Sequence, residues 1–254
     1  MARTARKLGE SGIYHVMLRG INQSELFYDS DDRQAFLERL ARFKLGDSYK
    51  LYAYALMGNH VHLLIAEGTD KLSLIMKKIA VSYSYWFNAK YLRSGYLFEG
   101  RFKSEPVDDD SYFLTVFKYI HLNPVKVGSS IDSWTSYDEY MDNPKLVDTD
   151  FVLDMFADNK EDAQGLLREF LEVPLADDAG ILGAEKPNAL ADEVAIEKIK
   201  AISGLDTCDK LADLDKVSRD KMLHQLKREG FTIRQISRLT RINRGIVQKA
   251  KAQD

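Results

Sequence analysis

The first 43 residues combine one strand-like segment with one helical segment. Residues 13–19 are rich in β-branched and aromatic side chains, a composition that predicts a strand. Ser30 can cap the helix that follows, in which Phe36, Leu40 and Phe43 are apolar and recur with helical spacing. The chain therefore begins with a strand followed by a helix.

A hairpin and a long amphipathic helix are predicted next. Residues 51–57 are strand-like, Gly58-Asn59 suits a two-residue turn, and residues 60–65 form the partner strand. An apolar stripe with helical spacing then predicts a helix over roughly residues 70–92.

An extended segment and another helix complete this part of the chain. Residues 96–107 have an extended pattern, and a helix is predicted from Asp109 or Asp110 to about Asn123. It should end there because Pro124 disfavours helical backbone at the residue before it. The order β-α-β-β-α-β-α fits an antiparallel sheet with helices on one face. The predicted fold class is α+β, a ferredoxin-like split β-α-β domain followed by an all-α C-terminal region.

The second half of the chain is predicted to be helical throughout. Helices at about 149–173 and 189–203 carry most of the acidic charge and suggest a connecting region. Residues 218–228 predict a further helix closed by Gly230.

The C-terminal pattern is typical of a helix-turn-helix unit. Thr232 can cap a second helix, and Asn243, after a short turn, can cap a third that ends near Lys251. Basic side chains stay outside, which fits DNA binding; a basic three-helix packing module is the alternative. Arg241 occupies the turn position where glycine is common. The candidate DNA-binding residues of this unit are Arg234, Arg238, Arg241, Arg244 and Lys249.

Charge is distributed unevenly along the 254 residues, whose net charge is −3. Residues 1–128 hold 18 Lys and Arg against 14 Asp and Glu, residues 129–215 hold 7 against 22, and residues 216–254 hold 11 against 3. Two basic ends, +4 and +8, therefore flank a middle of −15. Basic ends suit a polyanion such as nucleic acid, although charge runs also occur as solvated faces.

Cysteine content and hydropathy indicate a cytoplasmic protein. Cys208 is the only cysteine, which excludes an intramolecular disulfide and fits a reducing compartment. No stretch approaches the roughly 20 apolar residues of a membrane span, and no apolar signal core follows the basic N-terminus. We therefore expect a cytoplasmic location and no membrane partner.

His60 and His62 provide the first chemical signal. On a strand, residues two apart point to the same face, so the two imidazoles would lie side by side, with Val61 on the other face. Neutral imidazole is a common metal ligand, and two histidines need a third protein ligand to complete a site. Taken alone, a His-x-His pair favours structural or surface roles.

The second chemical signal lies in the helix before Pro124. Tyr119 is off the apolar stripe of this helix, and Asn123, four residues later, shares its face. Taken alone, Tyr119 is one of 13 tyrosines and fits a boundary residue with its hydroxyl in water. The other histidines, His15, His121 and His224, are predicted to be structural.

Together these stretches resemble the single-tyrosine HUH transposases, in particular the REP-associated tyrosine transposases and their relatives. The resemblance covers about residues 10–128, and the C-terminal helix-turn-helix is similar to the one appended to some longer members. The family usually has proline where this chain has Gly58, which changes the turn and removes no ligand. The matching motifs are Tyr-His-Val-Met-Leu-Arg-Gly at 14–20, Tyr-Ala-Leu-Met-Gly-Asn-His-Val-His-Leu-Leu at 54–64, Gly-Arg-Phe-Lys-Ser at 100–104, and Tyr-Ile-His-Leu-Asn-Pro-Val at 119–125.

The resemblance implies metal-assisted cleavage of DNA. His60 and His62 would bind a divalent metal, usually Mg²⁺ or Mn²⁺, with Asn123 at the position of a polar third ligand and Tyr119 as the nucleophile. A phenol of pKa about 10 costs roughly 4 kcal/mol to ionise at pH 7. The metal would act mainly by polarising a phosphate oxygen. Attack by Tyr119 would leave a 5′-phosphotyrosine and a free 3′-hydroxyl, so a second 3′-hydroxyl can rejoin the strand.

The expected protein is a cytoplasmic DNA transposase or strand transferase acting on single-stranded or hairpin DNA, with duplex DNA as a further partner of its C-terminal unit. Residues 1–128 would form the HUH single-tyrosine catalytic domain, 129–215 an acidic helical connecting region, and 216–254 the helix-turn-helix unit. Further candidates for phosphate contacts are Arg3, Arg6, Lys7, Arg19, Arg101 and Lys103.

Two other functions and one question of assembly stay open. A domesticated DNA-binding regulator would keep the fold without catalysis. A metal-dependent phosphodiesterase would use water as the nucleophile and leave Tyr119 passive. Family members also include dimers whose tyrosine acts across subunits, so a homodimer is one of the states that the resemblance allows.

Overall fold

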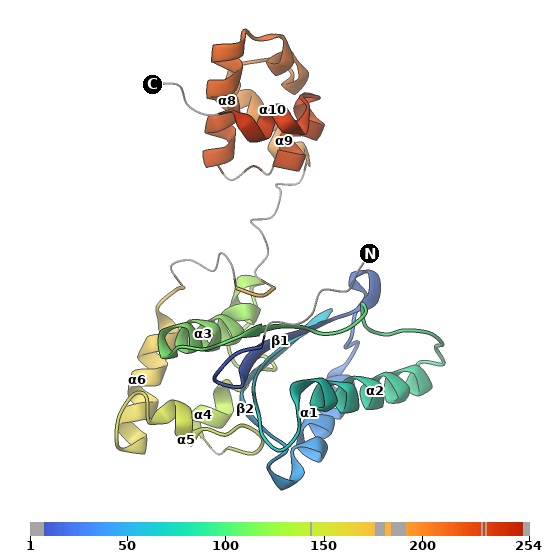
Figure 1. Cartoon of the computed structure of the whole chain (residues 1–254), viewed down its shortest axis with the longest axis vertical. Helices are drawn as coiled ribbons and strands as arrows, with labels where there is room; N and C mark the ends of the chain where they lie inside the picture. The colour runs from blue at the N-terminus through green and yellow to red at the C-terminus, as the bar shows by residue number, and fades with distance from the viewer. Residues whose placement is uncertain are drawn as a thin grey trace. The chain divides into compact units, whose positions relative to one another are not determined.

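The chain contains two compact units, Met1–Ala184 and Glu185–Asp254. The computed structural model describes residues 8–142, 144–175, 181–183, 192–229, 231 and 233–250. Figure 1 shows the helices and strands of both units. Each unit buries its own hydrophobic core. Across the described ranges, no helix combines the length and the apolar character that a membrane crossing requires.

One antiparallel sheet organises the first unit. Among the described residues, four strands pair in the order β2-β3-β1-β4, and every pair is antiparallel. This order, with one helix after β1 and one after β3, is the ferredoxin-like split β-α-β topology, so the predicted fold class is confirmed. The elements of this unit are β1 Ile13–Arg19, α1 Ser30–Phe43, β2 Tyr49–Met57, β3 His60–Glu67, α2 Leu72–Lys90, β4 Lys103–Pro106, α3 Asp110–Lys126, α4 Tyr137–Met141, α5 Asp150–Leu153 and α6 Lys160–Glu172.

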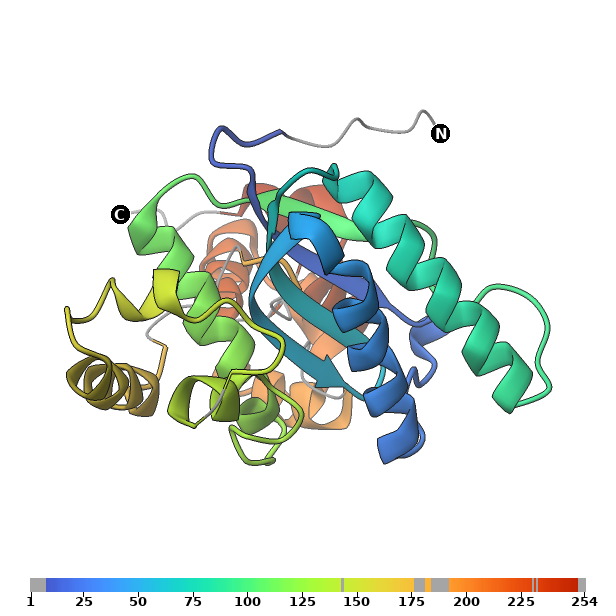
Figure 2. The same cartoon turned by 90° about the horizontal axis from the view of Figure 1, so that it is seen from below.

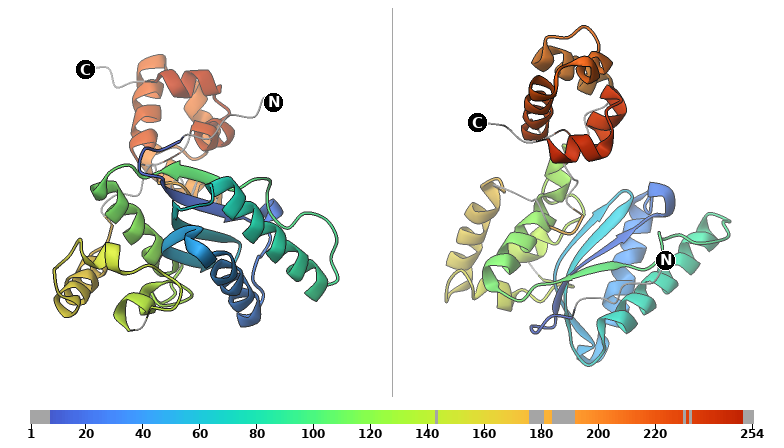
Figure 3. Two further views of the ribbon diagram at one scale, coloured as in Figure 1. Left: turned by 60° about the horizontal axis from the view of Figure 1, so that its bottom comes forward. Right: turned by 45° about the horizontal axis from the view of Figure 1, so that its top comes forward.

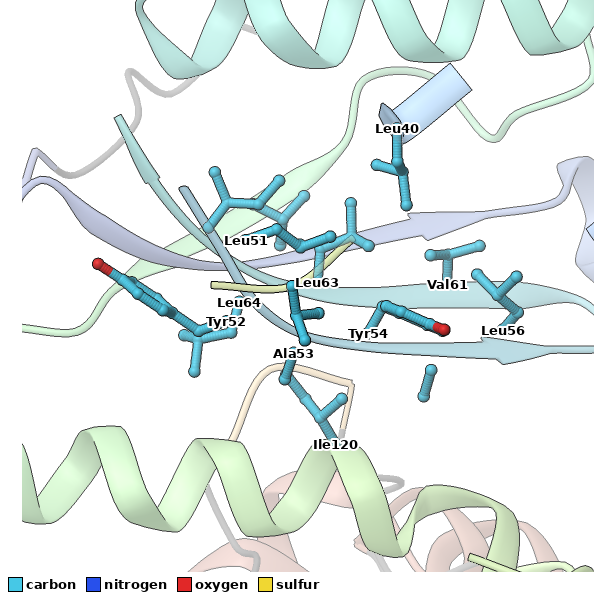
Figure 4. Close-up of a cluster of buried hydrophobic side chains, with 14 of the residues drawn as sticks. Leu40, Leu51, Tyr52, Ala53, Tyr54, Leu56, Val61, Leu63, Leu64 and Ile120 are labelled. Atoms are coloured by element: carbon cyan, nitrogen blue, oxygen red, sulfur yellow. The ribbon is translucent and has the colours of Figure 1, made fainter. Parts of the chain in front are cut away.

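Helices cover both faces of this sheet, and the prediction of helices on one face was wrong. α1 and α2 pack together on one side, and α3 packs on the other side against β2 and β3 (Figures 2 and 3). Ile120 of α3 lies next to Ala53, whereas Leu40 of α1 lies on the opposite side of the sheet (Figure 4). The apolar stripe of α3, which includes Phe113 and Phe117, is buried against this second face.

The ends of two helices differ from the prediction. Asp29, and not Ser30, caps α1: its carboxylate accepts the Asp32 N–H, and the Asp32 carboxylate accepts the Asp29 N–H. α3 passes through Pro124 and ends at Lys126. The preference of a residue before proline for extended backbone is a bias, and here it is overridden in a helix that buries both Asn123 and Pro124.

Two predicted segments are only partly regular. Of residues 96–107, only Lys103–Pro106 form a strand; Phe98, earlier in the segment, makes an isolated bridge to Gly20. The helix expected over 149–173 is two helices, α5 and α6, because Asn159 interrupts the run and caps α6 through the Asp162 N–H.

The turn between β2 and β3 has two residues, as predicted, and Gly58 occupies its first position. Met57 pairs with His60, so Gly58 and Asn59 alone connect the strands. A Cβ at Gly58 would overlap the carboxylate of Glu25. The backbone carbonyl of Gly58 accepts the N–H of Leu26 at 2.7 Å, which ties the turn to the segment before α1.

The acidic region expected to connect two domains is divided between the two units. α4, α5 and α6 contribute Tyr140, Val152 and Leu167 to the core of the first unit. The following helix, α7 (Asp192–Ser203), contributes Ala195 to the core of the second. The predicted limits at 128 and 215 followed charge, which marks exposed faces, whereas the division at 184 follows the buried apolar faces.

The second unit is helical in its described residues. It contains α7, the short helix η3 (Cys208–Asp213), α8 (Lys216–Arg228), α9 (Ile233–Thr240) and α10 (Arg244–Lys249). Asn243 caps α10 by accepting the Gly245 N–H, as expected. Arg241, in the turn between α9 and α10, has a φ of 60°, the left-handed conformation that glycine adopts more easily. Gly230, Thr232 and Lys251 lie outside the described residues.

Candidate active site

The two histidines of β3 lie on the sheet face that α3 covers. His62 is opposite Met17 of β1, and His60 is opposite Arg19 at the end of the same strand. The centroids of the two imidazole rings are 5.0 Å apart. The rings are therefore neighbours on one face, the arrangement that residues two apart on a strand adopt.

Asn59 determines which nitrogen of His60 carries the proton. Nδ1 of His60 lies 2.7 Å from Oδ1 of Asn59. An amide oxygen only accepts, so Nδ1 donates and Nε2 presents a lone pair. Burial, together with the nearby charge of Arg19, lowers the pKa of His60 to about 4. The ring is consequently neutral at pH 7, the form that binds a metal ion.

His62 is hydrogen-bonded to a third histidine, His15 of β1. Nδ1 of His62 is 2.9 Å from Nε2 of His15, and both side chains are fully buried. Within the described part of the chain, Nε2 of His62 has no hydrogen-bond partner. Burial is the main reason that the pKa of His62 is far below its ordinary value, with further lowering from His15 and other positive groups. His62 is therefore a neutral imidazole with one unused nitrogen.

α3 brings Tyr119 to the same place. The centroid of the Tyr119 ring is 5.5 Å from that of His62 and 6.0 Å from that of His15. Only 1% of the Tyr119 side chain is exposed. The ring of Tyr119 therefore lies beside the rings of His62 and His15.

Lys126 is a site residue that reasoning from the sequence missed. Its Nζ lies 4.2 Å from the centroid of the Tyr119 ring. Its charge also acts on His62, whose pKa it helps to lower. The spacing of seven residues, two helical turns, could have indicated this proximity, but the helix was expected to end at Asn123.

Asn123, the expected third ligand, keeps its side chain on α3. It is 7% exposed, and its Nδ2 donates to the carbonyl of Tyr119 at 3.1 Å. This hydrogen bond uses the amide nitrogen, so Oδ1 is the atom with which Asn123 would bind a cation. Its role as a ligand stays a prediction.

The chemistry of these residues fits a divalent metal ion. Nε2 of His60 presents a lone pair, and Nε2 of His62 is buried without a partner among the described residues. The same part of the chain holds no group of three or more His, Cys, Asp or Glu arranged for a metal. A further protein ligand would have to be of another type, such as the amide of Asn123.

The backbone at Gly183 covers one edge of His62. A Cβ added to Gly183 would lie 2.6 Å from Cε1 and 3.2 Å from Nε2 of His62, and the residue has a φ of 84°. A side chain at this position would therefore collide with the imidazole as well as strain the backbone. Close approach of this segment helps to bury the site.

The candidate phosphate-binding residues of the first unit are only partly brought together. Arg19 lies opposite His60, and Lys103 of β4 lies opposite Met17, so both occupy the sheet face of the histidines. Arg101 is exposed in the loop before β4. The other three candidates, Arg3, Arg6 and Lys7, lie outside the described residues.

The remaining basic candidates belong to the second unit. Four of the five candidates have exposed side chains: Arg238, Arg241, Arg244 and Lys249. The side chain of Arg234 lies outside the described part.

His121 has a structural role at the back of α3. Its Nδ1 donates to the carbonyl of Phe117 at 2.9 Å, and its Nε2 accepts from Oγ of Ser136 at 2.8 Å. Ser136 in turn accepts the N–H of Tyr54 at 3.1 Å. This chain of hydrogen bonds connects α3 to β2 and uses both nitrogens of His121.

Acidification should destabilise the first unit through His121. Burial lowers the pKa of His121 to about 4, below its value of about 6.5 in an unfolded chain. Stability that is present above pH 6.5 is therefore lost as the pH falls toward 4, because only the unfolded chain takes up the proton. At about pH 5 the loss is roughly 2 kcal/mol.

Urea unfolding of the wild type and of His121→Gln measures this effect. Glutamine does not titrate, so the stability difference between the two proteins should shrink by roughly 2 kcal/mol between about pH 7.5 and pH 5. A difference that does not change with pH would contradict the role of His121.

Known proteins similar to this chain include one solved structure and one family. No curated protein matches the chain. One solved structure that is similar, a REP-associated tyrosine transposase bound to a REP hairpin, aligns with a TM-score of 0.48 and 18% identity, over 56% of this chain and 86% of that chain. Residues 10–123, which contain His15, His60, His62 and Tyr119, match the family described as transposase IS200 like. The matched region therefore resembles IS200-like transposases.

Proposed function

We propose that this protein is a transposase that cuts and rejoins single-stranded or hairpin DNA with Tyr119 as its nucleophile. The observation that carries the proposal is the position of the Tyr119 ring, with its centroid 5.5 Å from that of His62. The match of residues 10–123 to the IS200-like transposase family supports DNA transposition as the biological activity.

The proposed reaction exchanges one phosphodiester for another. The phenol oxygen of Tyr119 forms a bond to phosphorus while the bond from phosphorus to the 3′-oxygen breaks. The phenol loses its proton, and the 3′-oxygen gains one. The result is a 5′-phosphotyrosine and a free 3′-hydroxyl, and attack by a second 3′-hydroxyl reverses the step without an energy source.

The metal-binding residues and Lys126 would have different roles in this reaction. Bound Mg²⁺ or Mn²⁺ would supply polarisation of a phosphate oxygen. His60 and His62 would hold the ion through their Nε2 atoms, with Asn123 as the further ligand. Lys126, whose ammonium lies over the Tyr119 ring, would bring positive charge to the phosphate under attack.

The site is closed in the structure. Tyr119 is 1% exposed and His62 is fully buried, with the backbone of Gly183 against its ring. A DNA phosphate cannot contact Tyr119 or His62 until the groups that cover these two side chains move. We therefore expect DNA binding to displace the Gly183 backbone and the side chain of Lys126.

An assay with labelled hairpin DNA and Mn²⁺ distinguishes the three candidate functions. A labelled covalent protein adduct on a denaturing gel is the result that the transposase proposal predicts. Cleavage without an adduct would instead favour a phosphodiesterase that uses water. Binding without cleavage, tested with several hairpins and single strands, would favour a non-catalytic regulator.

The second unit would add affinity for duplex DNA. α9, the turn at Arg241 and α10 follow one another as in a helix-turn-helix, and Arg244 and Lys249 are exposed on α10. Basic side chains at these positions would contact phosphates, which makes affinity dependent on salt. A homodimer and a cytoplasmic location stay predictions.

Arg244→Ala should weaken duplex binding by about tenfold and lower the salt dependence by roughly one phosphate contact. The matched control is Lys210→Ala, an exposed lysine of the same unit that pairs with Asp206 at 2.9 Å. This control should bind duplex DNA like the wild type. Equal affinity and an equal salt slope for Arg244→Ala and wild type would contradict a contact by α10.

A further inference from the structure

We propose that His15 is a positioning residue that keeps the metal-binding nitrogen of His62 free of a proton. The inference rests on the proposed function, since it concerns the same metal site. Its tests, however, measure proton position and metal affinity, so they do not depend on DNA cleavage.

The two histidines are held together by the sheet itself. His15 and Met17 are on the face of β1 that also carries His62 from β3, since Met17 pairs with His62 and His15 pairs with Leu64. The His15 and His62 rings have centroids 5.1 Å apart, and Nε2 of His15 is 2.9 Å from Nδ1 of His62. Both side chains are fully buried. Adjacent paired strands therefore fix this contact independently of any ligand.

One proton between two neutral rings allows two arrangements. If Nδ1 of His62 donates to His15, Nε2 of His62 carries a lone pair and can bind a metal. If Nε2 of His15 donates instead, Nε2 of His62 carries the proton and cannot bind one. The acceptor role of His15 thus decides whether His62 is a ligand.

The surroundings favour the first arrangement. Among the described residues, Nδ1 of His15 and Nε2 of His62 have no partner in either arrangement. A cation at Nε2 of His62 would satisfy this nitrogen only when His15 accepts, so metal binding and the His15 hydrogen bond support each other.

His60 provides an internal comparison. Its Nδ1 donates to the amide oxygen of Asn59, which leaves Nε2 unprotonated. His15 would give His62 the same form through a different acceptor. The site would then present two Nε2 lone pairs, each fixed by a partner behind the ring, which is the usual arrangement around metal-binding histidines.

The proton position can be measured directly in the full-length, metal-free protein labelled with ¹⁵N-histidine. Long-range ¹H–¹⁵N correlation spectra separate protonated from unprotonated ring nitrogens. We expect His62 to be protonated at Nδ1 and unprotonated at Nε2, with assignments made by comparison with His15→Gln. The reverse pattern in His62 would overturn the proposal. The measurement itself is made on the wild type, and His15→Gln serves only to assign the signals.

Mn²⁺ affinity, measured by electron paramagnetic resonance of free Mn²⁺, provides the second test. His15→Leu removes the acceptor and should weaken Mn²⁺ binding by about 10- to 100-fold. His15→Gln keeps an acceptor oxygen and should restore affinity close to that of the wild type. His121→Leu, which also removes a fully buried, hydrogen-bonded histidine, is the control for general damage and should bind Mn²⁺ normally.

The outcomes separate this inference from the proposed function. Wild-type affinity in His15→Leu, or equal weakening in His15→Leu, His15→Gln and His121→Leu, would overturn the positioning role. If the wild type binds no Mn²⁺, the metal part of the proposed function fails, and the spectra of the metal-free protein still decide the proton position. If His15→Leu does not fold, the spectra of the metal-free wild type alone decide whether Nε2 of His62 carries the proton.

Discussion

Replacing Tyr119 with phenylalanine should abolish the covalent protein–DNA adduct and strand cleavage together. Phenylalanine keeps the ring that packs 5.5 Å from His62 but lacks the oxygen that would bond to phosphorus. Loss of a nucleophile typically lowers turnover by on the order of 10⁴-fold or more, so product should fall below detection. Adduct formation with labelled single-stranded DNA and Mn²⁺, resolved on a denaturing gel, measures this change.

A second tyrosine of the same helix provides the matched control. Tyr112, also on α3, donates its hydroxyl to Oε2 of Glu105 on β4 at 3.0 Å. Tyr112→Phe removes a hydroxyl without touching the histidines and should leave the adduct yield unchanged. An adduct that persists in Tyr119→Phe would identify a different nucleophile.

Replacing His62 with leucine should remove the Mn²⁺ dependence of cleavage and most of the cleavage itself. Leucine fills part of the volume of this fully buried side chain but has no lone pair with which to bind a metal. Charge stabilisation by a metal is worth several kcal/mol, so the rate should fall by about 10³-fold. The measurement is the initial rate of adduct formation as a function of Mn²⁺ concentration.

The control for this variant must also lose a buried histidine. His121→Leu is suitable because His121 is fully buried and bonded to Ser136 and Phe117, while its ring takes no part in the proposed chemistry. It should retain Mn²⁺-dependent cleavage at a temperature where both variants are folded. Full activity of His62→Leu, or full wild-type activity in excess chelator, would contradict a metal held by His62.

Local patterns were sufficient for most elements of the first unit. β1 has the bounds that its composition predicted, and the Gly58-Asn59 turn places His60 directly after it. These predictions succeeded because burial and turn chemistry act within a few residues. The same local rule at Pro124 failed, because packing of α3 overrides the preference of the preceding residue, and this error concealed Lys126.

The rest of the site depends on contacts between distant segments. His15 is 47 residues from His62, and only the pairing of β1 with β3 brings their rings together. Gly183 lies beside His62 although nothing in the surrounding sequence marks it as part of the site. Likewise, α6 belongs to the first unit because its apolar face, which includes Leu167, is buried in the core of that unit. The acidic charge of this region gave no indication of that burial.

The most direct test of Tyr119 as the nucleophile is to locate the DNA on the protein. The wild-type adduct is digested with nuclease and trypsin, and the modified peptide is identified by tandem mass spectrometry. Cleavage after Lys118 and Lys126 releases residues 119–126, in which Tyr119 is the only tyrosine, while Tyr112 falls in a different peptide. We predict a nucleotide 5′-phosphate on Tyr119 and a free 3′-hydroxyl on the other DNA fragment. Attachment to any other residue, or cut DNA without a modified peptide, would contradict the proposed function.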